Sequence, residues 1–224
     1  MSAHSAAASA GPASEPSGTA PRWRRLEPDQ RREQILACAI KLFGERPYSA
    51  VSTAELAREA GVARGLINHY FGTKRALYLT VVRRMVTFPE HAVARLPKGS
   101  LPQRVDGAVS WFLDVVSMYP KTWLAAVGAE GVGDLEVDRI LAEADDIAAD
   151  RILEAVDLAE VVAHREELRA MIRSYGALVK AAAREWLMRE TMPRKHVQLL
   201  LTNTLLAILR DTFPAVRTAP TDPR

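Results

Sequence analysis

Apolar residues recur at steps of three and four along most of the chain, and this spacing restricts the possible folds more than any other feature. In segments 167–189 and 194–213 the apolar positions follow the i, i+3, i+4, i+7 pattern almost without interruption. The pattern predicts amphipathic α-helices, and the sequence has no stretch with the alternating spacing and turn residues of β-strands. We therefore expect an all-α protein.

Length and composition narrow the class further. The 224 residues, 48% hydrophobic and 25% charged, are enough for one or two globular domains. The chain has one cysteine, Cys38, and five widely spaced histidines, so we expect no disulfide, metal site or cofactor. It has no run of about 18 uncharged apolar residues and no secretory signal, which predicts a cytoplasmic protein without a membrane partner.

Opposite charges are concentrated in different parts of the chain. Residues 22–84 contain 13 Lys and Arg and 6 Asp and Glu, a net charge of +7, whereas residues 127–168 contain 3 Arg and 13 Asp and Glu, a net charge of −10. A basic N-terminal third and an acidic centre indicate a polyanionic partner at one end of the molecule. The alternative is two solvated faces of opposite sign.

Changes in composition divide the chain into parts. Residues 1–21 are rich in Ala, Ser, Gly and Pro and are expected to form a disordered tail. The basic run 22–25 is either an arm that reaches a DNA minor groove or a soluble linker. We expect a compact helical domain at 22–88, a second one at 89–215, and a flexible C-terminus at 216–224.

Two short helices separated by a glycine are the most specific local feature, at about residues 52–71. Ser52 and Glu55 have the spacing of a capping box at the start of the first helix. Gly61 is placed to end that helix in a left-handed turn. Both ends of this short helix are therefore specified by local sequence.

The second short helix, at about 63–70, carries polar side chains on the face opposite its apolar residues. Arg64 and Asn68 are the main examples. Longer helices are expected on either side, at about 28–45 and 74–87, and later in the chain at 101–118 and from about 135 to 158 or beyond. Two short helices hinged at a glycine, with exposed Arg and Asn on the second, are the layout of a helix-turn-helix.

Two runs of residues carry a resemblance to a known family. They are Thr53-Ala54-Glu55-Leu56-Ala57-Arg58-Glu59-Ala60-Gly61-Val62 and Asn68-His69-Tyr70-Phe71-Gly72-Thr73-Lys74. The segment 35–78 that contains them resembles the DNA-binding domain of TetR-type transcriptional regulators. The resemblance implies an N-terminal three-helix domain that contains the helix-turn-helix, followed by a helical bundle for ligand binding and dimerisation. Ala63 stands where the family often has Ser or Thr, which removes a side-chain cap from the second helix.

The resemblance also implies how the motif would meet double-stranded DNA. The second helix would enter the major groove, where Arg64 could contact guanine and Asn68 could read adenine. Gly65 would let the backbone approach closely, and Thr53 and Lys74 would hold phosphates at helix N-termini. The expected DNA-binding residues are Thr53, Arg64, Gly65, Leu66, Asn68, His69, Tyr70, Thr73 and Lys74.

One copy of so small a motif would bind weakly, so we expect a homodimer that reads a pseudo-palindromic operator. The last two long helices of each subunit would form a two-fold, four-helix interface. The alternative is that both apolar stripes are internal core. The expected interface residues are Leu178, Ala182, Trp186, Leu201, Leu205 and Ile208.

The family resemblance further implies a pocket for a small-molecule effector among the C-terminal helices. Aromatic residues and Met in this region favour a largely apolar effector, although each residue could equally be ordinary core. The candidate lining residues are Trp111, Phe112, Val115, Met118, Tyr119, Trp123 and Tyr175.

The expected function is therefore that of a bacterial, ligand-responsive transcriptional regulator and not an enzyme, with repression as the family's usual mode. One alternative is a helical Mg²⁺-dependent enzyme, because Asp145, Asp146 and Asp150 resemble the aspartate-rich site of isoprenoid synthases. No second acidic motif follows, and together with Glu143 these residues are expected to form a solvated acidic face. The other alternative is an interaction module that does not read DNA.

Overall fold

The fold is built from helices alone in the part of the chain that the structure describes. The computed structural model describes residues 27–87, 89, 98–128, 133–156, 158 and 164–218. Every regular element in these ranges is helical, which confirms the all-α prediction. The tail expected at 1–21 and the basic run 22–25 lie outside the described residues.

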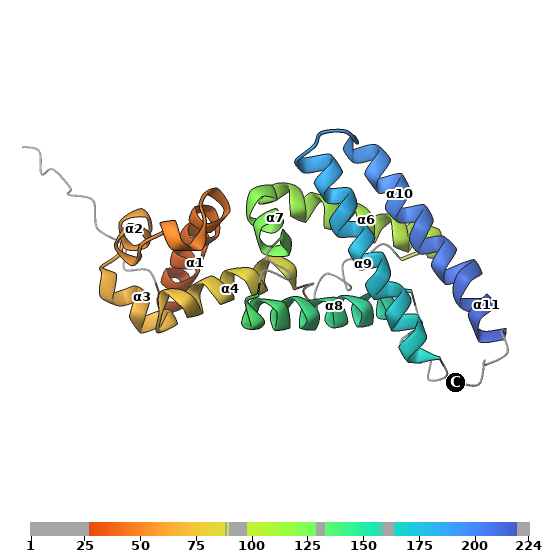
Figure 1. Ribbon diagram of the computed structural model, residues 1–224, viewed down its shortest axis with the longest axis horizontal. Coiled ribbons are helices and arrows are strands. Elements are labelled where there is room, and N and C mark those ends of the chain that lie inside the picture. Colours follow the sequence, from red (N-terminus) through yellow and green to blue (C-terminus); the bar gives the residue numbers. More distant parts are fainter. Residues whose placement is uncertain are drawn as a thin grey trace, which may run out of the picture.

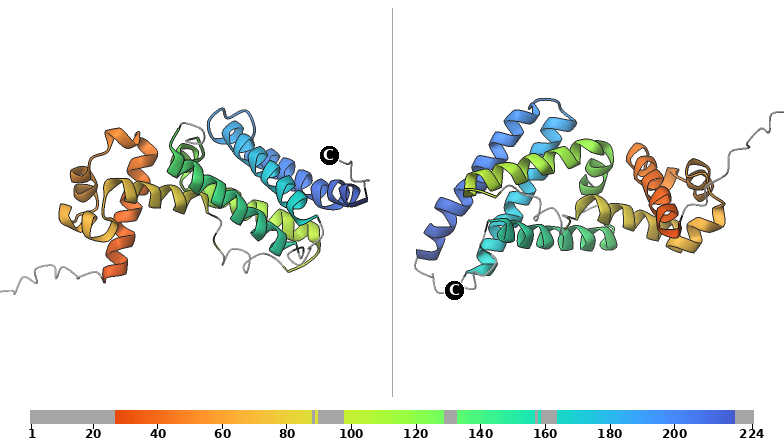
Figure 2. Two further views of the ribbon diagram at one scale, coloured as in Figure 1. Left: turned by 60° about the horizontal axis from the view of Figure 1, so that its bottom comes forward. Right: turned by 180° about the vertical axis from the view of Figure 1, so that it is seen from behind.

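The first group of helices packs around its own apolar core. It consists of α1 (Pro28–Glu45), the short 3-10 turn η1 (Tyr48–Ala50), α2 (Thr53–Glu59), α3 (Arg64–Phe71) and the first half of α4 (Lys74–Val86). Its core includes Ile35, Leu36, Ala39, Ile40, Phe43, Leu56, Ile67, Leu77 and Val81. The rest of α4 leaves this group and runs into the second one, so that a single helix joins the two (Figures 1 and 2).

The second group contains the remaining helices. They are α6 (Leu101–Met118), α7 (Pro120–Gly128), α8 (Leu135–Ala155), α9 (Arg165–Leu187), α10 (Arg194–Ala207), the π-helical turn η2 (Ile208–Thr212) and α11 (Phe213–Thr218). Their largest core cluster is formed by α6, α8, α9 and α10, with Leu113, Leu153, Leu168 and Leu201 among its fully buried members. The two helices α9 and α10 lie side by side at the end of the molecule opposite α3 (Figure 1).

Several helix boundaries follow the expectations closely, and two do not. The helices at 28–45 and 101–118 begin and end at the predicted residues. By contrast, α8 ends at Ala155, earlier than expected, and the last helix extends to Thr218 through the π-helical turn. The segment expected to be flexible from residue 216 is therefore helical for its first three residues.

The last helical stretch also has an unusual composition. From Arg194 to Thr218 it is long and apolar enough to cross a membrane by those two criteria alone. Within the fold it packs on the core of the second group through Val197, Leu201 and Leu205. Length and apolarity are weak evidence for a membrane span here, because the long core helix of a globular bundle also has them.

The two groups of helices approach each other very closely where α1 meets α7. The hydroxyl of Thr122, which is buried, donates a 2.9 Å hydrogen bond to the carbonyl oxygen of Ile40. A Cβ added to Gly44 would lie 2.1 Å from Thr122 Oγ1, so no side chain fits at this position without movement. The absence of a side chain at Gly44 is therefore what lets α1 rest on α7.

Candidate nucleic-acid interface

The start of α2 is capped as the sequence predicts, but only one half of the capping box forms. Ser52 Oγ accepts a 3.1 Å hydrogen bond from the amide of Glu55. The Glu55 carboxylate accepts a hydrogen bond from Arg46 and lies 3.8 Å from Arg58. The Arg46 contact is the main cause that lowers the pKa of Glu55. Glu55 thus ties α2 to the end of α1 instead of completing its own cap.

The turn between α2 and α3 is made at Gly61, which has a φ of +62°. The amide of Gly61 donates to the carbonyl of Arg58 at 3.1 Å, and the amide of Val62 donates to the carbonyl of Ala57 at 2.9 Å. These bonds close the end of α2 in the left-handed turn that the sequence predicts. The following helix begins without a side-chain cap at Ala63, as expected for an alanine.

Helix α3 presents one polar and one apolar face. Ile67 and Phe71 are buried in the core of the first group. Arg64, Gly65, Asn68 and His69 are exposed on the other face, and we call these four residues the recognition surface. Among the described residues, Arg64 and Asn68 have no side-chain hydrogen bond or ion pair, so both side chains are available to a ligand.

The other residues around this surface have mixed environments. Tyr70 is half-buried against the core, and its ring meets His69 edge-on with 5.1 Å between centroids. Leu66 and Thr53 are also half-buried. A Cβ added to Gly65 would meet no atom within 4 Å, so nothing inside the protein requires a glycine there.

The side chain of Lys74 has hydrogen-bond partners inside the protein. Its ammonium group donates hydrogen bonds to the carbonyl oxygens of Tyr48 and Val51, at 2.9 and 2.8 Å, and lies 4.0 Å from the Tyr48 ring centroid. The side chain is thus turned toward the η1 turn, where the carbonyl of Tyr48 also accepts a hydrogen bond from the amide of Val51. Thr73 caps α4 instead, accepting a 3.0 Å hydrogen bond from the amide of Ala76.

The seven expected effector-pocket residues do not gather in one place. Trp123 and Tyr175 are buried, but in different core clusters, and Phe112 packs edge-on against Trp123 at 5.9 Å. Trp111 and Val115 are half-buried. Met118 and Tyr119, at the end of α6, are 63% and 46% exposed. Burial raises the pKa of the Tyr175 phenol, so it keeps its proton at neutral pH.

The expected dimer residues lie largely within their own subunit. Ala182, Leu201 and Leu205 are at most 3% exposed in its core. The others, Leu178, Trp186 and Ile208, are partly buried against the same core. The exposed apolar residues of α10 are Leu199 and Leu200, at 51% and 36%, on a different face of the helix. The most regular apolar stripe thus packs on the core of its own subunit.

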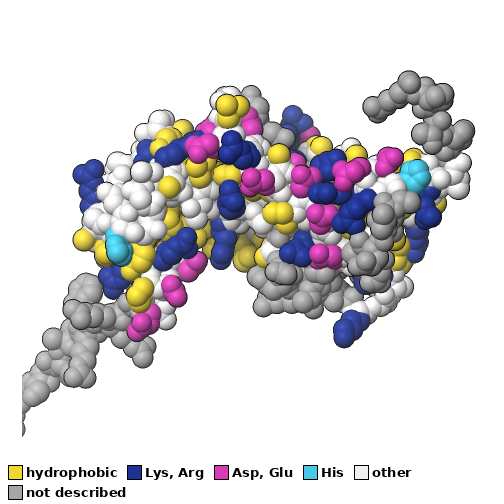
Figure 3. All heavy atoms as spheres, turned by 90° about the horizontal axis from the view of Figure 1, so that it is seen from below, with side chains coloured by type: hydrophobic (Ala, Val, Ile, Leu, Met, Phe, Trp, Pro, Cys, Tyr) yellow, Lys and Arg dark blue, Asp and Glu magenta, His cyan; other side chains and the backbone are white. Residues whose placement is uncertain are grey.

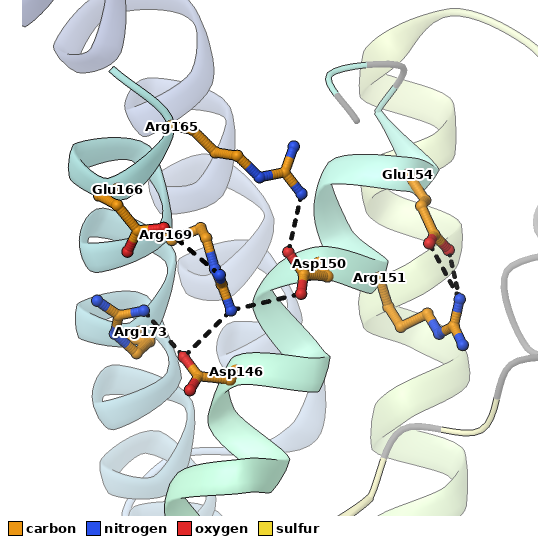
Figure 4. A network of polar contacts seen from close by, with 8 residues as sticks. All are labelled: Asp146, Asp150, Arg151, Glu154, Arg165, Glu166, Arg169 and Arg173. Atoms are coloured by element: carbon orange, nitrogen blue, oxygen red, sulfur yellow. Dashed lines mark hydrogen bonds and ion pairs between the residues drawn. The ribbon is translucent and has the colours of Figure 1, made fainter. Parts of the chain in front are cut away.

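The acidic run of α8 is ion-paired with α9 and is not simply solvated. Arg169 lies between Asp146 and Asp150, with 3.4 Å to each, and Arg173 donates to Asp146 at 2.9 Å (Figure 4). Lys180 pairs in the same way with Asp145 at 2.9 Å. On the surface, acidic side chains are accordingly interleaved with Lys and Arg over the second group of helices (Figure 3). Within the described ranges no cluster of metal-ligating side chains occurs, and these carboxylates already hold basic partners.

Sequence comparison finds similarity to transcriptional regulators. The family described as bacterial regulatory proteins, tetR family, matches residues 35–81, from α1 to α4. The chain is 27% identical over 175 residues to the HTH-type transcriptional activator FasR of Mycolicibacterium smegmatis, covering 77% of this chain and 79% of the relative. It is 31% identical over 116 residues to the HTH-type transcriptional regulator BetI of Rhizobium meliloti, covering 50% of this chain and 57% of that regulator.

A solved structure extends the similarity to most of the fold. The crystal structure of a tetR-family transcriptional regulator from Streptomyces coelicolor has a TM-score of 0.66 and 25% sequence identity with this chain. The similarity covers 86% of this chain and 88% of the other one. The likeness therefore includes the second group of helices, beyond the segment that the family description matches.

Proposed function

This chain belongs to the TetR family of bacterial transcriptional regulators, which bind DNA through a helix-turn-helix and are not enzymes, and on that premise we propose a specific mode of action. The protein acts in the cytoplasm as a homodimeric repressor. It holds a pseudo-palindromic operator through two copies of α3. A small, largely apolar effector releases it from that operator.

The observation that carries the proposal is the recognition surface of α3. Arg64 and Asn68 extend from one exposed face of a helix whose other face is anchored in the core. A guanidinium can form two parallel hydrogen bonds to guanine, and a carboxamide can do the same with adenine. The major groove is about 12 Å wide and admits one α-helix, which fits an element exposed in this manner.

Phosphate contacts follow from the helix ends around α3. Backbone amides in the first turns of α2 and α4 have no acceptor within the helix and can donate hydrogen bonds to an anion. The cap residues of these helices, Ser52 and Thr73, are both exposed. Thr53 lies in the first of these turns. The backbone amides near Lys74, and not its side chain, contact the phosphate, because its ammonium group is held by the carbonyl oxygens of Tyr48 and Val51. These contacts set the register of α3 in the groove.

The proposed dimer uses the outer face of α9 and α10. Leu199 and Leu200 give α10 an exposed apolar edge, and Ala177 and Ala181 are exposed small residues on the neighbouring α9. Two copies of this helix pair, related by a two-fold axis, form a four-helix interface in which the alanines allow close approach. To read two half-sites one turn of DNA apart, this dimer must hold its α3 helices about 34–36 Å apart.

The effector site is proposed among the aromatic residues of the second group. Phe112 and Trp123 pack edge-on, and the protonated phenol of Tyr175 supplies a hydrogen-bond donor in an otherwise apolar core. An effector changes DNA affinity only if it binds one spacing of the two α3 helices better than another. The close contact of α7 with α1 gives movements in the second group a direct route to the DNA-binding helices.

Activation is the second candidate mode. The relative aligned over 79% of its length, FasR, is named a transcriptional activator. The same recognition surface serves either mode, because the sign of regulation depends on where the operator lies relative to a promoter. A reporter placed behind the bound promoter, measured with and without the protein, separates repression from activation.

The test of base reading removes Arg64 and Asn68 together. DNA fragments selected by the wild-type protein are titrated with the Arg64→Ala/Asn68→Ala variant and with Arg139→Ala, which removes an exposed arginine from α8. Each lost base contact costs about 1–3 kcal/mol, so we expect the double variant to lose its sequence preference while Arg139→Ala keeps it. If the double variant keeps the same preference, direct reading by Arg64 and Asn68 is wrong. If the wild-type protein itself selects no DNA fragments, the interaction module becomes the better interpretation.

A further inference from the structure

A cleft of about 370 Å³ lies between the two groups of helices, away from the core of α6, α8, α9 and α10. It is bounded by the end of α1 and the turn after it, by α4, and by α7. We propose that this cleft is a binding site for a small, uncharged, planar aromatic molecule. The site is separate from the effector site proposed above and does not depend on DNA binding.

The walls of the cleft give the chemistry of the ligand. On one side Phe43, Tyr48 and Tyr78 form an aromatic cluster, with Tyr78 edge-on to Phe43 at 5.2 Å and 4.9 Å from Tyr48 between ring centroids. On another side the wall is aliphatic, with Val82 from α4 and Ala125 from α7. A flat aromatic ring packs well on such walls, through offset or edge-on ring contacts and apolar burial.

Size and charge exclude other classes of occupant. A volume of about 370 Å³ lies in the range of small-ligand sites, whereas a helix with its side chains is about 10–12 Å across. The charged residues that line the cleft are one acid and one base, Glu45 and Arg46. The lining therefore has no net charge to attract an ion, so an uncharged molecule fits best.

One polar group in the wall can orient such a molecule. The phenol of Tyr78 is half-buried, and burial, followed by the charge of Asp134, raises its pKa. Tyr78 therefore keeps its proton at neutral pH and can donate a hydrogen bond to an oxygen or nitrogen of the ligand. An aromatic molecule with one such acceptor matches the site better than a plain hydrocarbon.

The position of the cleft means that a bound molecule would affect the spacing of the two groups of helices. Its walls belong to both groups of helices, and Tyr48 is held by Lys74, at the start of the helix that follows α3. A ligand that touches α1, α4 and α7 at once stabilises the spacing of the two groups seen here over any other. Occupancy would thereby bias the position of α3.

The test measures binding of 2-naphthol to the full chain by equilibrium dialysis in the absence of DNA. Ala125 is exposed and lines the cleft, so Ala125→Phe fills it from the α7 side, and Ala125→Leu fills it in part. Ala37→Phe places the same ring on an exposed position of α1 outside the cleft and is the matched control. We expect saturable binding by the wild type, an affinity lowered by at least about tenfold in Ala125→Phe, an intermediate affinity in Ala125→Leu, and no change in Ala37→Phe.

Three outcomes would overturn the proposal. They are no saturable binding up to about 1 mM, equal affinity in the wild type and Ala125→Phe, and binding that weakens as protein concentration rises, which would assign the cleft to a second copy of the chain. Thermal unfolding confirms that each variant is folded, and the graded Ala125→Leu result supports the test if Ala125→Phe is unstable. Because no DNA is present, the result is independent of whether the proposed operator reading is right.

Discussion

At the scale of single residues, this protein uses polar side chains to close its turns, and for its lysine the residue type does not reveal that role. Ser52 and Thr73 cap two helices, while Lys74 holds the carbonyls of the η1 turn. A lysine at the start of a helix beside a DNA-binding motif equally suits a phosphate. The two hydrogen bonds of its ammonium group favour the internal role.

Lys74→Met keeps the apolar stem of the side chain and removes its donors. We expect the free energy of unfolding to fall by about 2 kcal/mol, because the two carbonyls lose a charged hydrogen-bond donor. The salt dependence of DNA binding should keep its slope, since a lost phosphate contact would reduce that slope by about 1. Denaturant unfolding and binding at several salt concentrations check both, with exposed Lys195→Met as the control. A smaller salt-dependence slope with an unchanged free energy of unfolding would show that Lys74 contacts a phosphate.

At the scale of elements, α2 and α3 are too short to be stable alone and depend on caps and on packing. Gly61 and Gly65 lie four residues apart in this unit with different requirements. Gly61 has a positive φ, which a residue with a Cβ adopts only at a cost. Gly65 is helical, and space around it is open.

The two glycines therefore predict opposite effects of alanine. Gly61→Ala should lower the free energy of unfolding by about 1–2 kcal/mol, because the left-handed conformation becomes strained. Gly65→Ala should raise it by up to about 1 kcal/mol, because alanine favours the helix. If α3 approaches DNA as proposed, Gly65→Ala should nevertheless weaken operator binding. Unfolding curves and DNA titrations of both variants test this, and unchanged operator affinity in Gly65→Ala would argue against a close approach.

At the scale of the whole molecule, polar contacts join the two groups of helices. Arg75 of α4 donates to Asp134 at 2.6 Å and to Glu136 at 3.1 Å, at the start of α8. Asp134 also caps α8 by accepting from the amide of Val137 at 3.3 Å. One carboxylate thus begins a helix of the second group and binds the helix that follows α3.

This contact predicts a pH dependence of stability. The hydrogen bond from Arg75 lowers the pKa of Asp134 below the value of about 3.9 for an unfolded chain. Its contribution is therefore complete at neutral pH and is lost as the pH falls through the folded-state pKa. Asp134→Asn keeps the cap but not the charge, so it should be less stable than the wild type near neutral pH, and the two should converge in acid.

Unfolding measured from neutral to acidic pH checks this, with Asp211→Asn, an exposed residue of η2, as the control. A gap between wild type and Asp134→Asn that stays constant down to the lowest pH would contradict the ion pair between α4 and α8. A gap of the same size in Asp211→Asn would show that the effect comes from net charge.

The proposed dimer makes a second prediction at this scale. Leu199→Asp places a charge on the exposed apolar edge of α10, where burial against a partner would cost its hydration. We expect this variant to be monomeric by light scattering and to bind the operator with much lower affinity, while its helix content stays that of the wild type. Leu135→Asp, at another exposed leucine, should remain dimeric. Loss of the dimer in both variants, or in neither, would place the interface elsewhere.

The sequence by itself determined the features that depend on neighbours along the chain. The helical class, the boundaries of α1, α4 and α6, the cap at Ser52 and the turn at Gly61 follow from spacings of three or four residues, or from single cap positions. Local rules also placed Arg64 and Asn68 on the outer face of α3, because the apolar residues of the same helix mark its inner face.

Only the tertiary structure decided what each exposed or apolar residue meets. Leu201 lies inside and Leu199 outside, although both are leucines of one helix, because α6 and α9 cover one face of α10 and leave the other bare. In the same way, Lys74 reaches carbonyls more than 20 residues away, and Asp146 meets arginines of another helix. The spacing of apolar residues indicates that a helix has an apolar side. Which element covers that side is decided by contacts between distant parts of the chain.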